Sequence, residues 1–331
     1  VGINLMSKKV WTPILLSLLV MAIWGSLFPF VQWGFKEFQL RTSDVSPLGA
    51  AADSLLYAGI RFFISGLIIS IISFIKKENV YFKKNNKAIL GVVLVGLFAV
   101  LAHYACTYLG LLTVSSTNTA LLKQSGALIF VCFSFIFIKD DKFSIFKVLG
   151  AIVGIGAICF INYEPSSMKF DFTLGSLFVI IASLCTVISN IFYKKFLTNA
   201  PSFAVTGFSQ FIGGIFLLII GLSMGGRISH ISPLGVVIFI YTVVATIVSY
   251  WLWYKIAKDY ELSKLYIIKM SEPLFAALVS YLIKPLNATI SYKHAIAFGL
   301  VAIAIVLSNV KLKKKEDSYE SDACGKSTTN L

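Results

Sequence analysis

Residues 88–111 read AILGVVLVGLFAVLAHYACTYLGL and hold no Asp, Glu, Lys or Arg. A helix needs about 20 mostly apolar residues to cross the hydrocarbon core of a bilayer, so this stretch is long enough to span one. In both directions from it, the chain repeats the pattern of apolar runs between short polar segments. We therefore expect an all-α polytopic membrane protein with ten transmembrane helices, over residues 10–33, 54–75, 88–111, 115–138, 145–163, 174–193, 203–222, 233–254, 264–283 and 292–310.

The composition supports this membrane class. Of 331 residues, 57% are hydrophobic and 13% are charged, whereas a soluble domain carries about 25% charged residues. The net charge of +14 comes from lysines clustered beside the apolar runs, where lysines anchor membrane helices on the cytoplasmic side. We therefore expect the lipid bilayer, and no nucleic acid, as a partner of this chain.

The basic residues also predict the orientation. With a cytoplasmic N-terminus, nineteen lysines fall in cytoplasmic segments and six basic residues in external ones, and such a bias sets topology. We expect residues 1–9 and a disordered polar tail, residues 311–331, to be cytoplasmic at a bacterial plasma (inner) membrane. We interpret residues 1–5 as an extension upstream of Met6. The cytoplasmic set is Lys8, Lys9, Lys76, Lys77, Lys83, Lys84, Lys87, Lys139, Lys142, Lys147, Lys194, Lys195, Lys255, Lys258, Lys264, Lys311, Lys313, Lys314 and Lys315, and the external set is Lys36, Arg41, Lys169, Arg227, Lys284 and Lys293.

Two short matches predict an inverted repeat. Leu-Gly-Val-Val occurs at 90–93 and 234–237, and Lys-x-Ser occurs at 123–125 and 269–271. Both matches relate apolar run n to run n+5, so the chain divides into two halves of five runs each. An odd number of spans inserts the second half in the opposite sense. Secondary transporters often use this plan, with a binding site near the bilayer midplane.

Three motifs carry a resemblance to a known family. Residues 22–26 read AIWGS, residues 61–63 read RFF, and Glu272-Pro273 is followed by small residues at 276 and 277. With ten runs in two halves, the chain resembles the drug/metabolite transporter superfamily, EamA type. Two positions differ from that pattern: run four lacks the proline expected near Ala127, and the acidic motif after it reads Asp140-Asp141-Lys142.

This resemblance implies two EamA-like repeats, residues 10–163 and 174–310. It also implies transport or export of a small metabolite without a bound cofactor. It does not name the substrate, because the superfamily moves several chemical classes.

The first candidate site residues lie in run four. An ionisable residue inside a membrane helix costs roughly 2.5–3.5 kcal/mol and usually marks function. Lys123 lies near the midplane, is followed by Gln124 and Ser125, and is preceded by Asn118. We expect this polar segment to face a cavity in which Lys123 binds an anionic substrate group. The alternative is a structural lysine paired with a carbonyl or a carboxylate.

Run nine holds the second candidate group. Lys269 is the repeat mate of Lys123, and Glu272 follows three residues later, so the two can pair on one helix face. Pro273 removes a backbone hydrogen bond and predicts a break in the helix there. A binding site and a structural kink are equal alternatives. Glu272 is the only carboxylate well inside a run, so it is the candidate for coupling to protons or to a counter-substrate.

Three further features complete the candidate site. Arg61 lies about seven residues into its run, from where it can snorkel to the outer interface. We expect a gating or structural role for Arg61 and Pro273, with direct substrate binding by Arg61 as the alternative. Trp24 and Tyr104 would shape the cavity. The aromatic residues at 250, 251, 253 and 254 fit an interfacial belt better than a substrate path. Three cations against one carboxylate favour an anionic or zwitterionic substrate.

Motifs for catalysis are absent from the sequence. It lacks H-E-x-x-H, G-x-S-x-G and paired intramembrane aspartates, and its three histidines are scattered. We expect a secondary transporter that works by alternating access, driven by gradients or exchange, with no catalytic residue, metal or cofactor. A non-transporting membrane scaffold and, with less support, a membrane-embedded enzyme are the alternatives. A homodimer stays open.

Overall fold

The computed structural model of the chain describes residues 8–42, 45–111, 114, 116–139, 141–161, 173–283 and 292–309. The predicted tail and most of the predicted N-terminal segment lie outside these ranges, as do Asp140 and the side chain of Asn118. The predictions made for them therefore stay predictions.

All regular structure in the described ranges is helical, without a strand among them. The helices are α1 (Lys8–Glu37), α2 (Pro47–Ile75), α3 (Val80–Lys83), α4 (Asn86–Val95), η1 (Gly96–Ala102), α5 (His103–Leu111), α6 (Ser116–Phe137), α7 (Ile145–Ile161), α8 (Leu174–Phe192), η2 (Tyr193–Leu197), α9 (Ser202–Ser223), α10 (Pro233–Asp259), α11 (Leu262–Lys269), α12 (Glu272–Leu282) and α13 (Tyr292–Asn309).

These helices confirm the predicted ten-helix, all-α membrane class. Eight helical segments of the described chain are long and apolar enough to cross a membrane, and the apolar parts of α6 and α7 add two shorter ones. Several spans combine elements: α4, η1 and α5 form one, α8 and η2 form another, and α11 and α12 a third. Such spans satisfy their backbone hydrogen bonds internally, as the hydrocarbon core of a bilayer requires.

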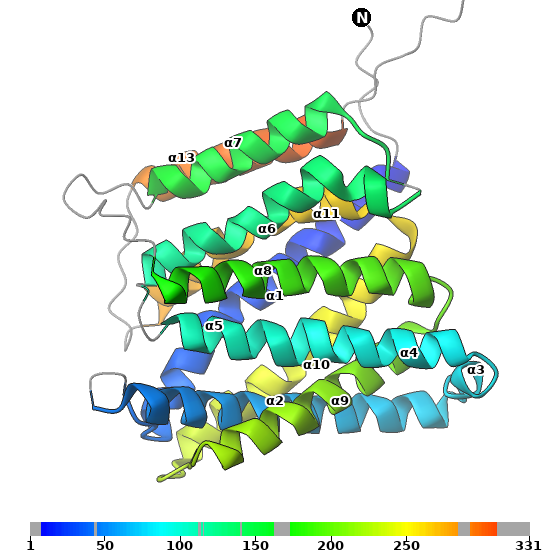
Figure 1. The fold of residues 1–331 in the computed structure, drawn as a ribbon. Coiled ribbons are helices and arrows are strands. Elements are labelled where there is room, and N and C mark those ends of the chain that lie inside the picture. The colour runs from blue at the N-terminus through cyan, green and yellow to red at the C-terminus, as the bar shows by residue number, and fades with distance from the viewer. Residues whose placement is uncertain are drawn as a thin grey trace, which may run out of the picture.

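The packing of the helices shows the two halves. Spans with the same place in each half lie side by side, α2 against α9 and α7 against α13 (Figure 1). Two other sets of contacts correspond between the halves. Helix α1, the first span, packs on α10 and α12, and α8, the sixth span, packs on α5 and α6. Span 1 therefore contacts spans 8 and 9, and span 6 contacts spans 3 and 4. An internal twofold axis that relates span n to span n+5 requires this correspondence.

Glycines set the closest contact, between α2 and α9. A Cβ atom on Gly59 would lie 2.6 Å from the backbone nitrogen of Leu218, and one on Gly221 would lie 2.6 Å from that of Leu56. Neither position tolerates a side chain unless the helices move apart. Small residues allow this approach, which supplies the van der Waals contact that drives helix association in lipid.

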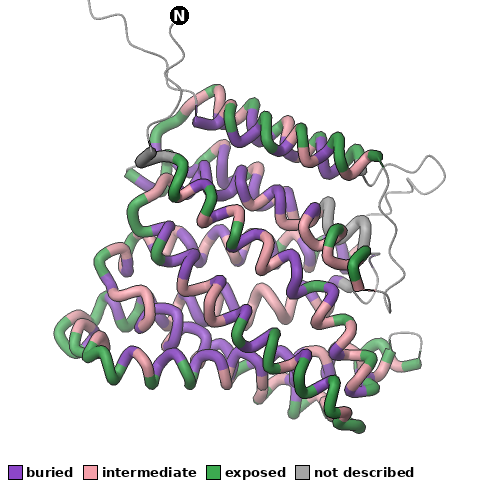
Figure 2. The backbone as a smooth tube through the Cα atoms, turned by 180° about the vertical axis from the view of Figure 1, so that it is seen from behind, coloured by how far each residue is buried: buried purple, intermediate pink, exposed green. Residues whose placement is uncertain are grey.

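The burial pattern fits a membrane environment. Buried residues line the seams between helices, and exposed residues follow the outer faces (Figure 2). Many exposed side chains on these faces are large and apolar, among them Phe133, Ile136, Leu149, Ile152 and Ile303. Water would not stabilise so much exposed apolar surface, so lipid is the solvent for these faces.

The lysine-rich connections gather at one end of the bundle. The start of α1, the connections from α2 to α4, from α6 to α7 and from α8 to α9, the turn between α10 and α11, and the end of α13 all lie at the right of Figure 1. We call this the lysine-rich end.

Candidate functional site

The span formed by α11 and α12 is interrupted in the middle. Helix α11 ends at Lys269 and α12 begins at Glu272, with a turn at Met270 and Ser271. Pro273 stands in the first turn of α12, where its missing N–H removes no hydrogen bond and its fixed φ suits a helix start. The break therefore lies where the proline predicts it.

The break explains how two charges are held inside the span. Lys269 is in the last turn of α11, and Glu272 is in the first turn of α12. A helix dipole favours a cation at its C-terminal end and an anion at its N-terminal end. Lys269 and Glu272 interact electrostatically, but none of the described ion pairs within 4.0 Å joins them. The turn removes them from a common helix face.

Lys269 lies between aromatic rings. Its Nζ is 5.5 Å from the ring centre of Trp24 and 5.4 Å from that of Tyr266. Trp24 in turn contacts Tyr250 and Trp253, with ring centres 5.4 and 5.1 Å apart. Trp253 is 3% exposed, so the interfacial belt predicted for this stretch is wrong at that residue. The rings form a wall beside the break in the helix.

The structure explains why a glycine follows Trp24. A Cβ atom at Gly25 would lie 2.7 Å from the Cβ of Phe275 and 2.8 Å from the carbonyl oxygen of Glu272. Only glycine lets α1 approach the first turn of α12 so closely. The contact places the neighbouring Trp24 beside Lys269.

Lys123 lies near its repeat mate, Lys269, at the break between α11 and α12. It interacts electrostatically with Lys269 and Glu272, and both lysines interact with His103. Its Nζ also lies 5.2 Å from the ring centre of Phe28 on α1. Helix α6 runs unbroken through Lys123, since it has no proline matching Pro273. The structure thus brings together three predicted site residues, Lys123, Lys269 and Glu272, from opposite halves of the chain.

The polar neighbours of Lys123 are less clearly part of the cluster. Gln124 is buried. The hydroxyl of Ser125 donates to the carbonyl of Leu122 and lies 3.2 Å from the hydroxyl of Ser183 on α8. Ser125 therefore has a local role in packing α6 against α8. The binding role predicted for these residues and for Asn118 stays a prediction.

Arg61 does not snorkel, and that expectation was wrong. It is 2% exposed and lies 14 residues from either end of α2, which is about 21 Å of helix. The helix begins at Pro47, with Ser46 as its N-cap, well before the apolar run. The guanidinium carbon instead lies 4.7 Å from the ring centre of Phe62 and 5.5 Å from that of Tyr104.

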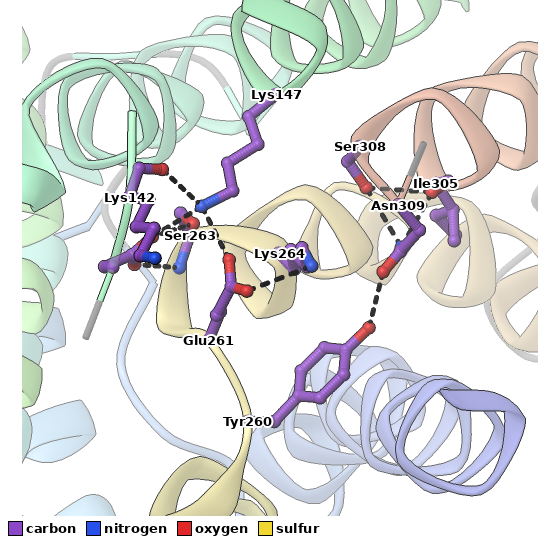
Figure 3. Close-up of polar contacts among 10 residues, drawn as sticks. Lys142, Lys147, Tyr260, Glu261, Ser263, Lys264, Ile305, Ser308 and Asn309 are labelled. Carbon is purple, nitrogen blue, oxygen red and sulfur yellow. Dashed lines mark hydrogen bonds and ion pairs between the residues drawn. The ribbon is translucent and has the colours of Figure 1, made fainter. Parts of the chain in front are cut away.

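A polar network joins the two halves at the lysine-rich end, and the sequence did not predict it. Asp141, which is 2% exposed, accepts hydrogen bonds from the backbone N–H of Ser263 at 2.9 Å, from the Ser263 hydroxyl and from Lys147 Nζ at 2.7 Å. Lys147 also pairs with Glu261 at 2.6 Å, and Glu261 pairs with Lys264 (Figure 3). The network ties the α6–α7 loop of the first half to the start of α11 in the second.

Tyr260 extends this network to the last helix. Its hydroxyl donates to the side chain of Asn309 at 2.8 Å (Figure 3). Burial raises the pKa of Tyr260 to about 12, so the hydroxyl stays protonated as a donor at neutral pH. A cavity of about 230 Å³ opens beside the network, lined in part by Ile138, Lys194, Lys258 and Asp259.

A second buried network positions Tyr266 beneath Lys269. Trp253 Nε1 donates to Asn190 Oδ1 at 2.9 Å, and Asn190 Nδ2 donates to the Tyr266 hydroxyl at 3.0 Å. That hydroxyl donates to the carbonyl of Thr186, also at 3.0 Å. Asn190 is a polar residue inside an apolar run, and this position could have marked it in the sequence as a buried hydrogen-bonding residue.

Comparisons with known proteins give the family and agree with the fold. The EamA-like transporter family matches residues 11–163 and 173–310. The uncharacterized transporter YoaV of Bacillus subtilis (strain 168) is 23% identical over 190 residues, 56% of this chain. That match spans 62% of the relative's length, less than two thirds of it. A solved crystal structure is similar in fold, with a TM-score of 0.70 at 15% identity, over 90% of this chain and 97% of the other.

Proposed function

This chain belongs to the EamA-like transporter family, and we propose that it moves a small anionic or zwitterionic metabolite across the membrane by alternating access. It is an integral membrane protein, as its apolar helices and its family indicate. The substrate class and the mechanism come from the candidate site.

The observation that carries the proposal is the cluster of Lys123, Lys269 and Glu272. Two cations and one carboxylate lie at helix positions inside the membrane, drawn from repeat-related segments of both halves. Ionisable groups in such places are expensive and mark substrate or ion pathways. The excess of positive charge attracts an anion, and Glu272 can accept an ammonium group or carry a coupling proton.

The network at the lysine-rich end supports alternating access. Asp141 of the first half and Ser263 of the second are joined by two hydrogen bonds. In our proposal these contacts hold the lysine-rich end closed, and they break when the halves exchange packing. Gradients of protons or of a counter-substrate would drive the exchange.

We also propose an orientation. The lysine-rich end faces the cytoplasm, because short loops rich in Lys and Arg stay inside. Both ends of the chain would then be cytoplasmic, in a bacterial plasma (inner) membrane.

A transporter and a membrane scaffold differ in how the Lys123 region treats water. A scaffold keeps this region dry and closed, whereas a transporter opens it to each side in turn. A membrane-embedded enzyme has less support, because the cluster combines two lysines and one carboxylate without a nucleophile of a known catalytic motif.

The test is a ligand screen on the purified full chain by thermal shift. The probes share one ring and differ in charge: benzoate, benzamide, benzylamine and zwitterionic phenylglycine. We expect benzoate or phenylglycine to raise Tm more than benzylamine does, and Lys123→Met to remove the difference. The matched control is Lys255→Met, since Lys255 lies the same 5.2 Å from an aromatic ring but is exposed at the end of α10.

Two results would overturn the proposal. One is a larger Tm shift with benzylamine than with the anions. The other is an anion effect that Lys123→Met leaves intact, or that Lys255→Met removes equally well.

A further inference from the structure

Arg61 is a charge in the middle of α2, the helix that packs along α9. It is 2% exposed and lies midway along α2. From there its side chain cannot snorkel to the headgroups at either end of the helix. A charge in this position needs a partner of opposite sign or a set of hydrogen-bond acceptors.

The described part of the protein supplies no such carboxylate. None of the ion pairs found there includes Arg61, and its buried Nε–H has no hydrogen-bond acceptor. Its neighbours are aromatic: Phe62 and Tyr104 lie against the guanidinium, and Tyr104, Tyr108 and Tyr250 interact with it electrostatically. Ring faces hold the guanidinium in place, but they do not supply its Nε–H with an acceptor, and none of the described residues does.

Other buried donors nearby share this property. Trp24 Nε1 and Gln210 Nε2 are buried without an acceptor in the described residues. Trp24 contacts Tyr250, which contacts Phe62 beside Arg61. Gln210 accepts a hydrogen bond from Ser65, one turn along α2 from Arg61. An unmet donor in the membrane interior costs free energy, and three in one region select for a group rich in acceptors.

The charge balance points the same way. Arg61, Lys123 and Lys269 are three cations in the membrane-spanning helices around this site, and Glu272 is the carboxylate that interacts with the lysines. Asp53 on α2 is paired with Arg41 near the start of that helix. The electrostatic interactions found for Lys123 are with Glu272, Lys269 and His103, whereas those found for Arg61 are with tyrosines. Arg61 is therefore a second positive centre, with Phe62 and Tyr104 against its guanidinium.

We infer that Arg61 binds an oxyanion group of the transported substrate, a carboxylate or a phosphate, at a position distinct from the two lysines. This inference rests on the proposed function. The planar fork of a guanidinium matches both groups in a bidentate way, and the neighbouring rings suit a flat or apolar substrate body. Arg61 is then a specificity-determining residue, held by its rings until the anion arrives.

The experiment measures thermal shifts of the purified full chain with benzoate, phenyl phosphate and neutral benzamide. The variants are Arg61→Met, Arg61→Lys and Lys123→Met. For Arg61→Met we expect the Tm without ligand to stay equal or to rise, because the variant removes an unpaired buried charge. We expect at least a tenfold loss of affinity for the anionic probe that binds. Arg61→Lys should keep the charge and regain part of that affinity.

The probes distinguish a phosphate from a carboxylate, and the variants distinguish failure of this inference from failure of the proposed function. A larger shift with phenyl phosphate assigns a phosphate group, and a larger shift with benzoate assigns a carboxylate; either supports the inference if Arg61→Met abolishes it. A structural role for Arg61 would instead lower the Tm of Arg61→Met without ligand and leave anion affinity unchanged, and that result overturns the inference. If Lys123→Met loses anion binding while Arg61→Met keeps it, the inference fails and the proposed function stands. If both variants keep it, both proposals fail.

Discussion

Replacing Asp141 with Asn removes one charge from the network at the lysine-rich end and leaves its shape intact. The carboxylate accepts from Ser263 N–H at 2.9 Å and from Lys147 Nζ at 2.7 Å, and it is 2% exposed. An amide can keep the bond to the backbone N–H. It presents an NH₂ group to the second donor, however, and it no longer neutralises Lys147.

The size of the effect follows from what Lys147 keeps. Removing one partner of a buried ion pair costs about 3–5 kcal/mol when the other charge is left alone. Lys147 retains Glu261 at 2.6 Å, but the Glu261 side chain is 34% exposed, so its compensation is partial. We therefore expect a loss of about 2 kcal/mol for the closed lysine-rich end, which is a shift of about 30-fold in the closed-to-open equilibrium.

Hydrogen–deuterium exchange of the protein in lipid nanodiscs reads this change directly. The first turn of α11, which holds the Ser263 amide, should exchange about 30-fold faster in Asp141→Asn. Asp259 is an exposed carboxylate that lines the neighbouring cavity. It takes part in none of the described ion pairs. Asp259→Asn is therefore the matched control, and we expect no change in its α11 peptides.

The reasoning is refuted if the α11 peptides exchange at the same rate in wild type and Asp141→Asn. It is also refuted if Asp259→Asn accelerates them equally, because a general charge effect would then explain both.

Three further predictions concern packing near the candidate site. Gly25→Ala should lower Tm and abolish anion-dependent stabilisation, because its Cβ would meet the start of α12 at 2.7–2.8 Å, whereas Gly156→Ala, with nothing within 4 Å, should leave both unchanged; equal Tm values for the two variants would contradict this. Pro273→Ala should leave Tm equal or higher but slow uptake into proteoliposomes, because a continuous helix moves the charges at the break, and unchanged uptake would show the proline to be only structural. Asn190→Leu should cost about 1–3 kcal/mol in the free energy of unfolding, measured by chemical denaturation, because it leaves the Trp253 N–H buried without its acceptor; a change below about 0.5 kcal/mol would mean that water replaces it.

Part of the candidate site could be predicted from local sequence. The repeat of Lys-x-Ser placed Lys123 and Lys269 at matching positions, and the structure brings them together. Pro273 predicted the break in its span, because a residue without an N–H favours a helix start over a helix interior. The Ser46-Pro47 pair was a helix-start signal that reached beyond the apolar run. Because the predicted run began at residue 54 and not at Pro47, Arg61 was placed too close to an interface.

Other parts depended on contacts that no local pattern encodes. Asp141 and Ser263 are 122 residues apart, and their contact follows from how the two halves pack. Helical spacing allowed Lys269 and Glu272 to form an ion pair on one face, but this spacing applies only while the helix continues. The break replaced a shared face with two separate helix ends.

The sequence by itself determined the class, the ten spans and the two related halves. Lipid leaves a polypeptide few ways to satisfy its backbone hydrogen bonds, so long apolar runs must be helices. Tertiary structure alone decided which side chains meet. It placed Arg61 among aromatic rings, with no ion pair to any described carboxylate, and it placed Asp141 against the start of α11. Those outcomes depend on the rotation and pairing of helices, which small differences in side-chain packing select and which hydropathy does not record.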